Sequence, residues 1–232
     1  MNLLDILFPL ECVWCGIQDN YICTQCKKSL QPHPEICPLT HRPSEAYAVR
    51  YDLLPHAEQY LEGVIVNFRF WPLIKELILD LKYHHRSHVA RFLGQKLALW
   101  LVSHEILWPL VSQDQLLITY VPSHWIRHYF TKWYNQSLLL AKWLCRELDI
   151  SPPQRLCKKT KHTHSQVGMS KTTRERNLTD AFTVLADIAP GSTIVIVDDV
   201  LTSGATLLEL AKTIKSQQTD CKIRGLTLAR HG

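Results

Sequence analysis

The most informative segment of this sequence is Val195-Ile196-Val197-Asp198-Asp199-Val200-Leu201-Thr202-Ser203-Gly204-Ala205-Thr206. Residues 193–197 form a run of β-branched, mostly apolar side chains, which predicts a central strand of a parallel sheet that is covered on both faces. Residues 205–217 carry apolar side chains at helical spacing. The stretch therefore predicts a buried strand, a short polar loop and a helix.

The polar residues between this strand and this helix have the chemistry of a ribose phosphate site. Two acids at a strand end, Asp198 and Asp199, can accept hydrogen bonds from the vicinal hydroxyls of a ribose or hold a magnesium ion. Hydroxyls and a glycine at a helix start offer donors to a phosphate, assisted by the helix dipole. The alternative is a strand capped by Asp and followed by an ordinary Thr/Ser turn. The sequence contains neither Gly-x-x-x-x-Gly-Lys nor Gly-x-Gly-x-x-Gly, which argues against a nucleoside triphosphatase or a dinucleotide dehydrogenase.

Strand and helix patterns alternate on both sides of this stretch. Strands are expected at 47–53, 63–68, 116–121, 154–158 and 222–229, and helices at 72–81, 89–101 and 135–148. Such alternation predicts an α/β fold, a parallel sheet with helices on both faces, whose ligands bind at the carboxyl ends of the strands. We expect residues 43–232 to form this domain and residues 1–42 to form a separate small module.

Four of the eight cysteines define the small module. Cys12 and Cys15 form one Cys-x-x-Cys pair, and Cys23 and Cys26 form another after seven intervening residues. Two such pairs can close a tetrahedral, structural zinc site with no open position. Disulfide bonds or a redox pair are the alternatives, and both are disfavoured by the absence of an export signal and of a preceding strand and helix pattern.

A second cysteine motif follows but is incomplete. Cys37-Pro38-Leu39-Thr40 has a threonine where a second cysteine would be expected, so we predict one zinc ion instead of two. His33 and His41 lie nearby and could ligate a metal or simply be solvated. No internal repeat is evident in the sequence.

Charge and aromatic residues leave the nature of the anionic partner open. The net charge is +5, and basic residues cluster between positions 158 and 176. Lys and Arg serve small phosphate compounds and nucleic acids alike. A mixed aromatic and basic cluster could stack on single-stranded bases or pack in the core; it comprises Trp125, His128, Tyr129, Phe130, Lys132, Trp133 and Tyr134. No signal peptide or membrane-spanning segment is recognisable, so we expect a cytoplasmic protein without membrane insertion.

The chain resembles the ComF family of competence proteins, whose main domain has the type I phosphoribosyltransferase fold. The resemblance rests on the cysteine pairs, on the Asp-Asp and Thr-Ser-Gly-Ala-Thr run that binds phosphoribosyl diphosphate (PRPP), and on shorter matches. These matches are Leu81-Lys82-Tyr83, Val121-Pro122 with Arg127, Asn135-Gln136-Ser137, Thr160, Gln166, Arg174, Arg176, Asn177 and Ala181-Phe182. The sequence departs from the family at Lys132-Trp133-Tyr134, where Arg-Gly-Phe is usual, and at the second cysteine motif.

The resemblance implies roles for individual residues. Asp198 and Asp199 would meet the ribose and magnesium and are the candidate catalytic residues. The 5-phosphate would bind at Thr202, Ser203, Gly204, Ala205 and Thr206. Lys82, the loop after Val121 and the basic loop 161–176 are candidates for the diphosphate, although the basic loop could equally be a solvated surface.

The family is associated with natural transformation, which implies handling of internalised single-stranded DNA in the cytoplasm. Expected partners are PRPP or a related ribose phosphate, single-stranded DNA, and a competence helicase or another transformation protein. An active phosphoribosyltransferase that transfers ribose 5-phosphate from PRPP to an unknown acceptor is the alternative. A fold kept only for ligand sensing is a third reading.

Overall fold

The computed structural model describes residues 11–18, 20–37, 39–54, 59–83, 87–103, 116–123, 135–160 and 179–231. Its centre is a four-stranded sheet in the order β1-β6-β5-β2. The strands are β1 (Gly63–Arg69), β2 (Leu116–Tyr120), β5 (Ser192–Leu201) and β6 (Cys221–Arg230). All three strand pairings are parallel. The predicted parallel α/β sheet is therefore confirmed.

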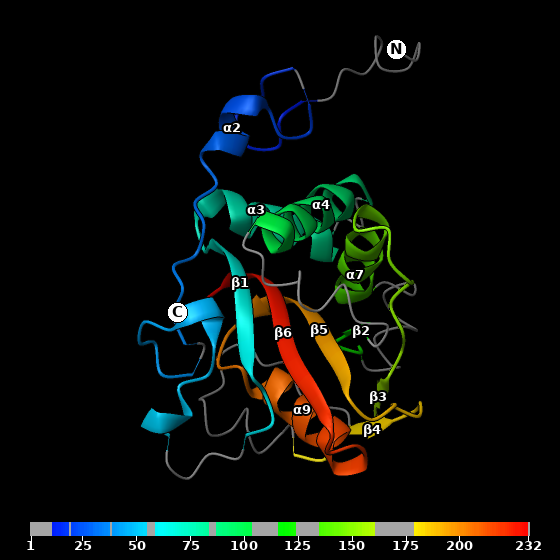
Figure 1. Ribbon diagram of the computed structural model, residues 1–232. Helices are drawn as coiled ribbons and strands as arrows, with labels where there is room; N and C mark the ends of the chain where they lie inside the picture. Colours follow the sequence, from blue (N-terminus) through cyan, green and yellow to red (C-terminus); the bar gives the residue numbers. More distant parts are fainter. Residues whose placement is uncertain are drawn as a thin grey trace.

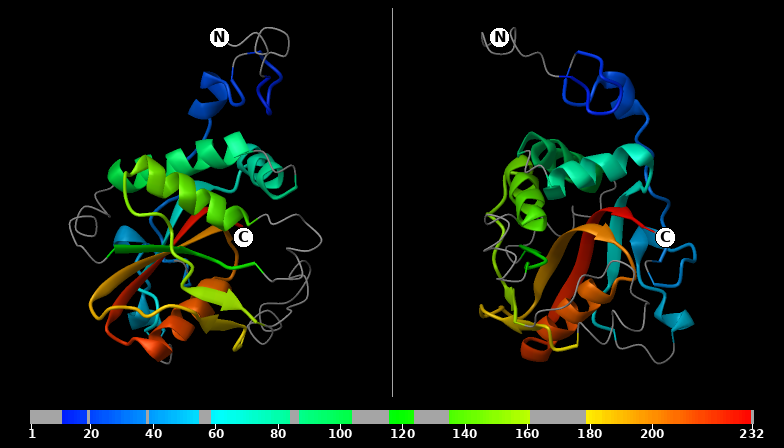
Figure 2. Two further views of the ribbon diagram at one scale, coloured as in Figure 1. Left: turned by 90° about the vertical axis from the view of Figure 1, so that its right-hand side faces the viewer. Right: turned by 180° about the vertical axis from the view of Figure 1, so that it is seen from behind.

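Helices cover both faces of this sheet (Figures 1 and 2). On one side lie α3 (Pro72–Tyr83), α4 (Ser87–Ser103) and α7 (Gln136–Glu147), and on the other lies α9 (Ala205–Gln217). Because helices lie on both sides, the residues 192–197 of β5 are buried throughout. This double burial explains why the strand lacks the polar alternation of a sheet with one wet face.

Local sequence signals place the helix starts. Pro72 opens α3, where its fixed φ suits the first helical position and its missing N–H costs nothing. Asn135 caps α7, and its side chain accepts a hydrogen bond from the backbone N–H of Leu138 (3.0 Å). Gly204 precedes α9 with φ of +77°, a conformation that glycine adopts without strain. The predicted helices 72–81, 89–101, 135–148 and 205–217 are all present within a few residues of their expected ends.

The strand expected at 47–53 is wrong. The structure has two short 3-10 helices there, η1 (Glu45–Tyr47) and η2 (Tyr51–Leu53), with positive φ at Ala46 and Tyr47. Tyr47 is buried, packs edge to face on Trp100, and donates its hydroxyl hydrogen bond to the carbonyl of His33. Tertiary packing of this aromatic side chain thus overrides the β propensity of the segment.

Two further strands form a separate pair outside the main sheet. β3 (Cys157–Lys159) confirms the strand expected at 154–158 in part, and it pairs antiparallel with β4 (Phe182–Val184), which was not predicted. β4 has only three residues, too few for a periodic pattern to be visible in the sequence.

The cysteine module, residues 11–18 and 20–30 of the described chain, lies next to α3 and α4 (Figure 1). Its short helix α2 (Thr24–Lys28) contains Cys26. Tyr21 joins the module to the larger domain, because its hydroxyl donates to Asp80 of α3 and its ring packs edge to face on His88 of α4. Among the described residues, no helix is both long and apolar enough to cross a membrane.

Gly94 fixes how closely α4 and α7 approach each other. A Cβ at this position would lie 2.5 Å from Cβ of Trp143 in α7. We expect Gly94→Ala to lower the free energy of unfolding by about 1–3 kcal/mol through overpacking, despite the roughly 1 kcal/mol gained in helix propensity. Denaturant unfolding would measure this, with Leu99→Ala on the exposed side of the same helix as the control. A stabilised Gly94→Ala variant would contradict the tight contact.

Candidate functional site

The two predicted acids lie near the carboxyl end of β5. Because β5 continues to Leu201, Asp198 and Asp199 are still part of the strand instead of the loop after it. Asp199 is buried with 6% exposure, and Asp198 is half-buried. Their position is the one at which ligands bind in parallel α/β sheets.

The start of α7 supplies hydrogen bonds to both acids. The hydroxyl of Ser137 donates to Oδ1 of Asp198 (3.0 Å), and the side-chain amide of Gln136 donates to Oδ2 of Asp199 (3.2 Å). From the sequence we expected no role for Asn135-Gln136-Ser137 beyond a family match. Polar residues that open a helix soon after a buried strand were the available signal, but their partners lie more than 60 residues away.

The last turn of α3 brings a cation to the same place. Nζ of Lys82 lies 3.0 Å from Oδ2 of Asp199. Three elements, α3, α7 and β5, therefore converge on the acid pair. Lys82 joins the predicted site, although here it contacts an acid that was expected to face the ribose.

Burial changes the acidity of the pair. It raises the pKa of Asp198 to about 7, with the adjacent Asp199 carboxylate adding to the effect. Hydrogen bonds from the backbone N–H of Asp199 and from Ser137, and the charge of Lys82, oppose the rise only partly. Near neutral pH, the Asp198 side chain is therefore present in both protonated and ionised forms, and the ionised form can bind a cation or accept a hydrogen bond from a hydroxyl.

The candidate phosphate loop follows directly. Thr202 is exposed, Ser203 is half-buried, and its hydroxyl accepts from the backbone N–H of Ala205 (3.4 Å). The loop ends at Gly204, and Thr206 lies in the first turn of α9. The N–H groups at the start of a helix and the positive end of the helix dipole favour an anion here.

The four predicted zinc ligands also come together. Sulfur atoms of Cys12, Cys15, Cys23 and Cys26 all lie within 4.8 Å of one another, and the Cys15 and Cys23 sulfurs are 3.6 Å apart. A tetrahedral zinc ion with bonds of about 2.3 Å would hold its sulfurs about 3.8 Å apart. The residues therefore fit a structural zinc ion.

Electrostatics within the cluster also favour a cation. Burial and the neighbouring thiols raise the pKa of Cys26. Burial would raise the pKa of Cys12 as well, yet hydrogen bonds from the backbone of Cys23, Cys15 and Trp14 outweigh it and lower that pKa to about 6. Several thiolates this close repel one another unless a metal ion neutralises them.

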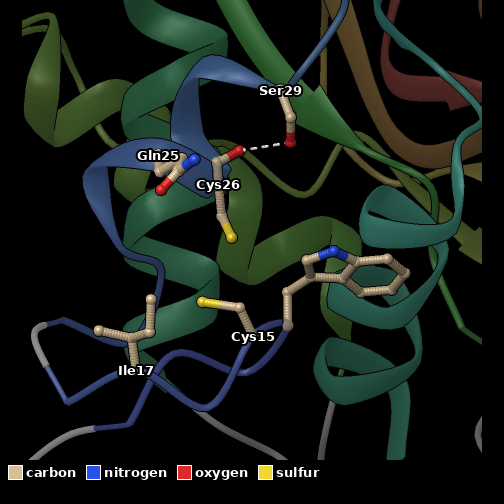
Figure 3. A pocket seen from close by; sticks show the side chains of 6 residues that line it. Cys15, Ile17, Gln25, Cys26 and Ser29 are labelled. Atoms are coloured by element: carbon tan, nitrogen blue, oxygen red, sulfur yellow. Dashed lines mark hydrogen bonds between the residues drawn. The ribbon is translucent and has the colours of Figure 1, made fainter.

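One side of the cluster opens into a small pocket (Figure 3). The sulfur atoms of Cys15 and Cys26 point toward each other there, and the hydroxyl of Ser29 donates to the carbonyl of Cys26 (2.8 Å). The lining residues are Trp14, Cys15, Ile17, Gln25, Cys26 and Ser29. Cys15 is the one exposed residue of the four, and the other three are buried.

Several predicted features lie outside the described residues. They are the basic loop 161–176, Arg127 and the aromatic cluster 125–134. Of the predicted basic cluster, Lys158 and Lys159 are described, both in β3, where Nζ of Lys159 lies 6.0 Å from the ring centre of Phe182.

Comparison with known protein families identifies two domains in this chain. Residues 135–232 match the phosphoribosyl transferase domain model, and residues 3–54 match the double zinc ribbon domain model. The chain thus combines a phosphoribosyltransferase domain with an N-terminal zinc ribbon region that carries four cysteines positioned to bind a zinc ion.

Whole-chain relatives narrow the class to a family. The chain is 29% identical over 215 residues to competence protein F of Haemophilus influenzae, covering 90% of this chain and 92% of that protein. It is 28% identical over 191 residues to the DNA utilization protein YhgH of Shigella flexneri and of Escherichia coli K12, with 82% of each chain covered. The chain is a homologue of competence protein F, which confirms the ComF resemblance.

Proposed function

We propose that this protein binds PRPP, or a related ribose phosphate, and acts in the handling of DNA taken up during natural transformation. The main observation in favour of PRPP binding is that the acid pair of β5 lies directly before the phosphate loop and the start of α9. The match of residues 135–232 to the phosphoribosyl transferase domain supports it.

Each group has a distinct task in this proposal. Asp198 and Asp199 accept hydrogen bonds from the ribose hydroxyls and hold the magnesium ion that accompanies a diphosphate. The loop 202–206 donates to the 5-phosphate. Lys82 leaves Asp199 when the ligand and its cation arrive, and its charge is then available to the diphosphate.

Affinity for PRPP is expected to depend on pH. The pKa of Asp198 is raised to about 7, so its proton must leave before the carboxylate can bind a cation. Affinity should rise about tenfold between pH 6 and pH 8 and then level off. Titration calorimetry with PRPP and magnesium, in buffers of different ionisation enthalpy, measures both the affinity and the protons released. Subtracting the ligand's own titration isolates the contribution of Asp198.

Two results would overturn this proposal. The absence of any heat with PRPP and magnesium at pH 8 would show that PRPP is not the ligand. A pH-independent affinity with no proton release would leave the ligand in place but remove Asp198 from its binding.

The DNA role rests on the names of the relatives, competence protein F and DNA utilization protein. We propose that the protein works in the cytoplasm on internalised single-stranded DNA, together with a competence helicase or another transformation protein. Fluorescence anisotropy with an oligothymidylate should show binding that weakens steeply with salt, because phosphate contacts release counterions. Binding should persist in Asp199→Asn, since the DNA would be held outside the acid pair. No binding at low salt would contradict direct DNA handling.

The alternative is an active phosphoribosyltransferase. In that case magnesium and the loop cations would stabilise the departing diphosphate while an acceptor attacks the ribose. Intact acids and an intact phosphate loop favour this possibility. Acceptor-dependent release of diphosphate from PRPP, screened over nucleobases and amines and lost in Asp199→Asn, would establish it.

A further inference from the structure

Residues 36–54 repeat the backbone of the cysteine module that precedes them. In the module, the backbone N–H of Cys12 donates to the carbonyl of Ile17 (2.9 Å), and that of Gly16 donates to the carbonyl of Cys12 (2.9 Å). Twenty-five positions later, the N–H of Cys37 donates to the carbonyl of Arg42 (2.8 Å), and that of His41 donates to the carbonyl of Cys37 (3.1 Å). The two turns therefore have the same hydrogen-bond pattern.

Other features of the two segments keep the same spacing. Gly16 has φ of +72° and His41, at the matching position, has φ of +58°. The antiparallel bridge Glu11–Gln18 has its counterpart in Ile36–Pro43. Positive φ is uncommon for a residue other than glycine. His41 nevertheless adopts it, so the backbone of the second turn has the same conformation as the first at this position.

The second half of the repeat is also present, at an offset of 27 positions instead of 25. The N–H of Cys23 donates to the sulfur of Cys12 (3.3 Å) just before α2, and the N–H of Arg50 donates to the sulfur of Cys37 (3.3 Å) just before η2. By this correspondence, the positions of Cys12, Cys15, Cys23 and Cys26 are taken in the second segment by Cys37, Thr40, Arg50 and Leu53.

These residues do not fit a zinc ion. Only Cys37 of the four offers a metal ligand, and Leu53 is 46% exposed. Within the described residues, the cluster of Cys12, Cys15, Cys23 and Cys26 is the one group of three or more side chains able to hold a metal ion. The double zinc ribbon model that matches residues 3–54 thus covers one repeat that fits zinc and one that does not.

An arginine from the far end of the chain reaches the second repeat. Arg230, the last residue of β6, is only 5% exposed. Its Nη1 donates to the carbonyl of Cys37 (3.5 Å), its Nη2 lies against Nε2 of His41, and its Nε has no hydrogen-bond partner. Burying a guanidinium is costly unless it is paired, so these contacts with the turn offset part of that cost.

We infer that the second ribbon of this protein holds no metal and that the buried guanidinium of Arg230 supports the Cys37–His41 turn in place of the lost zinc. The shape of this turn matters for the candidate phosphate loop, which it contacts. Cδ2 of Leu39 within it lies 3.2 Å from the position of a Cβ on Gly204, so the turn abuts the candidate phosphate loop. Arg230 also connects the second ribbon to β6, the neighbour of β5 in the sheet. A zinc ion would have connected only residues within the ribbon.

Metal content and thermal unfolding of the full-length protein test this inference. Wild type should contain one zinc per chain. Arg230→Gln should lower the melting temperature by roughly 5 °C, with zinc content unchanged. Arg230→Lys should lower it less because it keeps a cation. Arg224→Gln is the matched control on the same strand: its guanidinium contacts Glu62 and the carbonyl of Ala46 but not the Cys37–His41 turn, so this substitution should lower the melting temperature less than Arg230→Gln.

A gain of metal binding provides a second test. Adding Thr40→Cys, Arg50→Cys and Leu53→Cys to Arg230→Met restores four thiols and removes the competing cation. This variant should bind two zinc ions, and its cobalt form should show about twice the thiolate absorbance of wild type. Two zinc ions in wild type, a melting temperature unchanged in Arg230→Gln, or one zinc in the four-site variant would each overturn the inference.

Discussion

Cys23→Ser is expected to release the zinc ion and unfold the cysteine module. Cys23 is buried, caps α2 through its sulfur, and donates its backbone N–H to the sulfur of Cys12. The module has too few residues for a core of its own, so metal binding supplies most of its folding free energy, on the order of 10 kcal/mol for such sites. Elemental analysis should fall from one zinc per chain to none.

The larger domain should survive this loss. The described contacts between module and domain include the Tyr21 hydroxyl with Asp80, the Tyr21 ring with His88, and Lys27 near the ring of Phe92. Hydrogen exchange should therefore show lost protection in the module and retained protection in β5 and β6. Cys221→Ala, a buried cysteine outside the cluster, is the control and should keep its zinc. A Cys23→Ser protein that retains one zinc would contradict the site.

Asp199→Asn is expected to weaken PRPP binding by about 100-fold or more. The substitution removes a carboxylate that can hold a ribose hydroxyl and a magnesium ion, and charge-assisted hydrogen bonds contribute about 1.5–3 kcal/mol each. Calorimetry with magnesium and PRPP measures the loss. Asp187→Asn, an exposed acid, should bind like wild type. Unchanged affinity in Asp199→Asn would remove the acid pair from the ligand site.

Asp198→Asn should separate binding from stability. It is expected to weaken PRPP binding in the same way, yet to stabilise the unliganded protein above neutral pH. The folded-state pKa of Asp198 is raised to about 7 from an ordinary value of 3.8, so the folded state loses stability as pH rises from about 4 through 7. Asparagine cannot ionise and removes this loss. A gain in melting temperature at pH 8 that disappears at pH 4 is the expected signature, and equal melting temperatures at both values would contradict it.

Local patterns were sufficient for the parts of the fold that consist of continuous segments. The run 193–197 predicted β5 because a strand covered on both faces needs apolar side chains on both. Residues 205–217 predicted α9 with its observed ends, since Leu207, Leu210, Ala211 and Ile214 recur at helical spacing. The strand expected at 47–53 was wrong because the packing of one side chain, Tyr47 in η1, outweighs the β propensity of the segment.

The full internal repeat was not evident from the residue pattern for a related reason. Three of the four ligand positions in the second ribbon have changed to Thr40, Arg50 and Leu53, so Cys37 and Thr40 are recognisable only as an incomplete motif and the second pair of positions leaves no cysteine spacing. The backbone hydrogen bonds kept the pattern that the side chains lost. Such bonds are independent of residue type, and only coordinates reveal them.

Local residue patterns were enough to predict the strand, loop and helix around Asp198, Asp199 and Gly204, and the four cysteines of the zinc cluster, because each depends on residues that are close in the chain. The groups that surround these residues are known only from the folded structure. Lys82 reaches Asp199 from α3, Gln136 and Ser137 reach the acids from α7, and Arg230 reaches Cys37 across 193 positions. Contacts over such separations arise from how helices pack on the sheet, and no local periodicity encodes them.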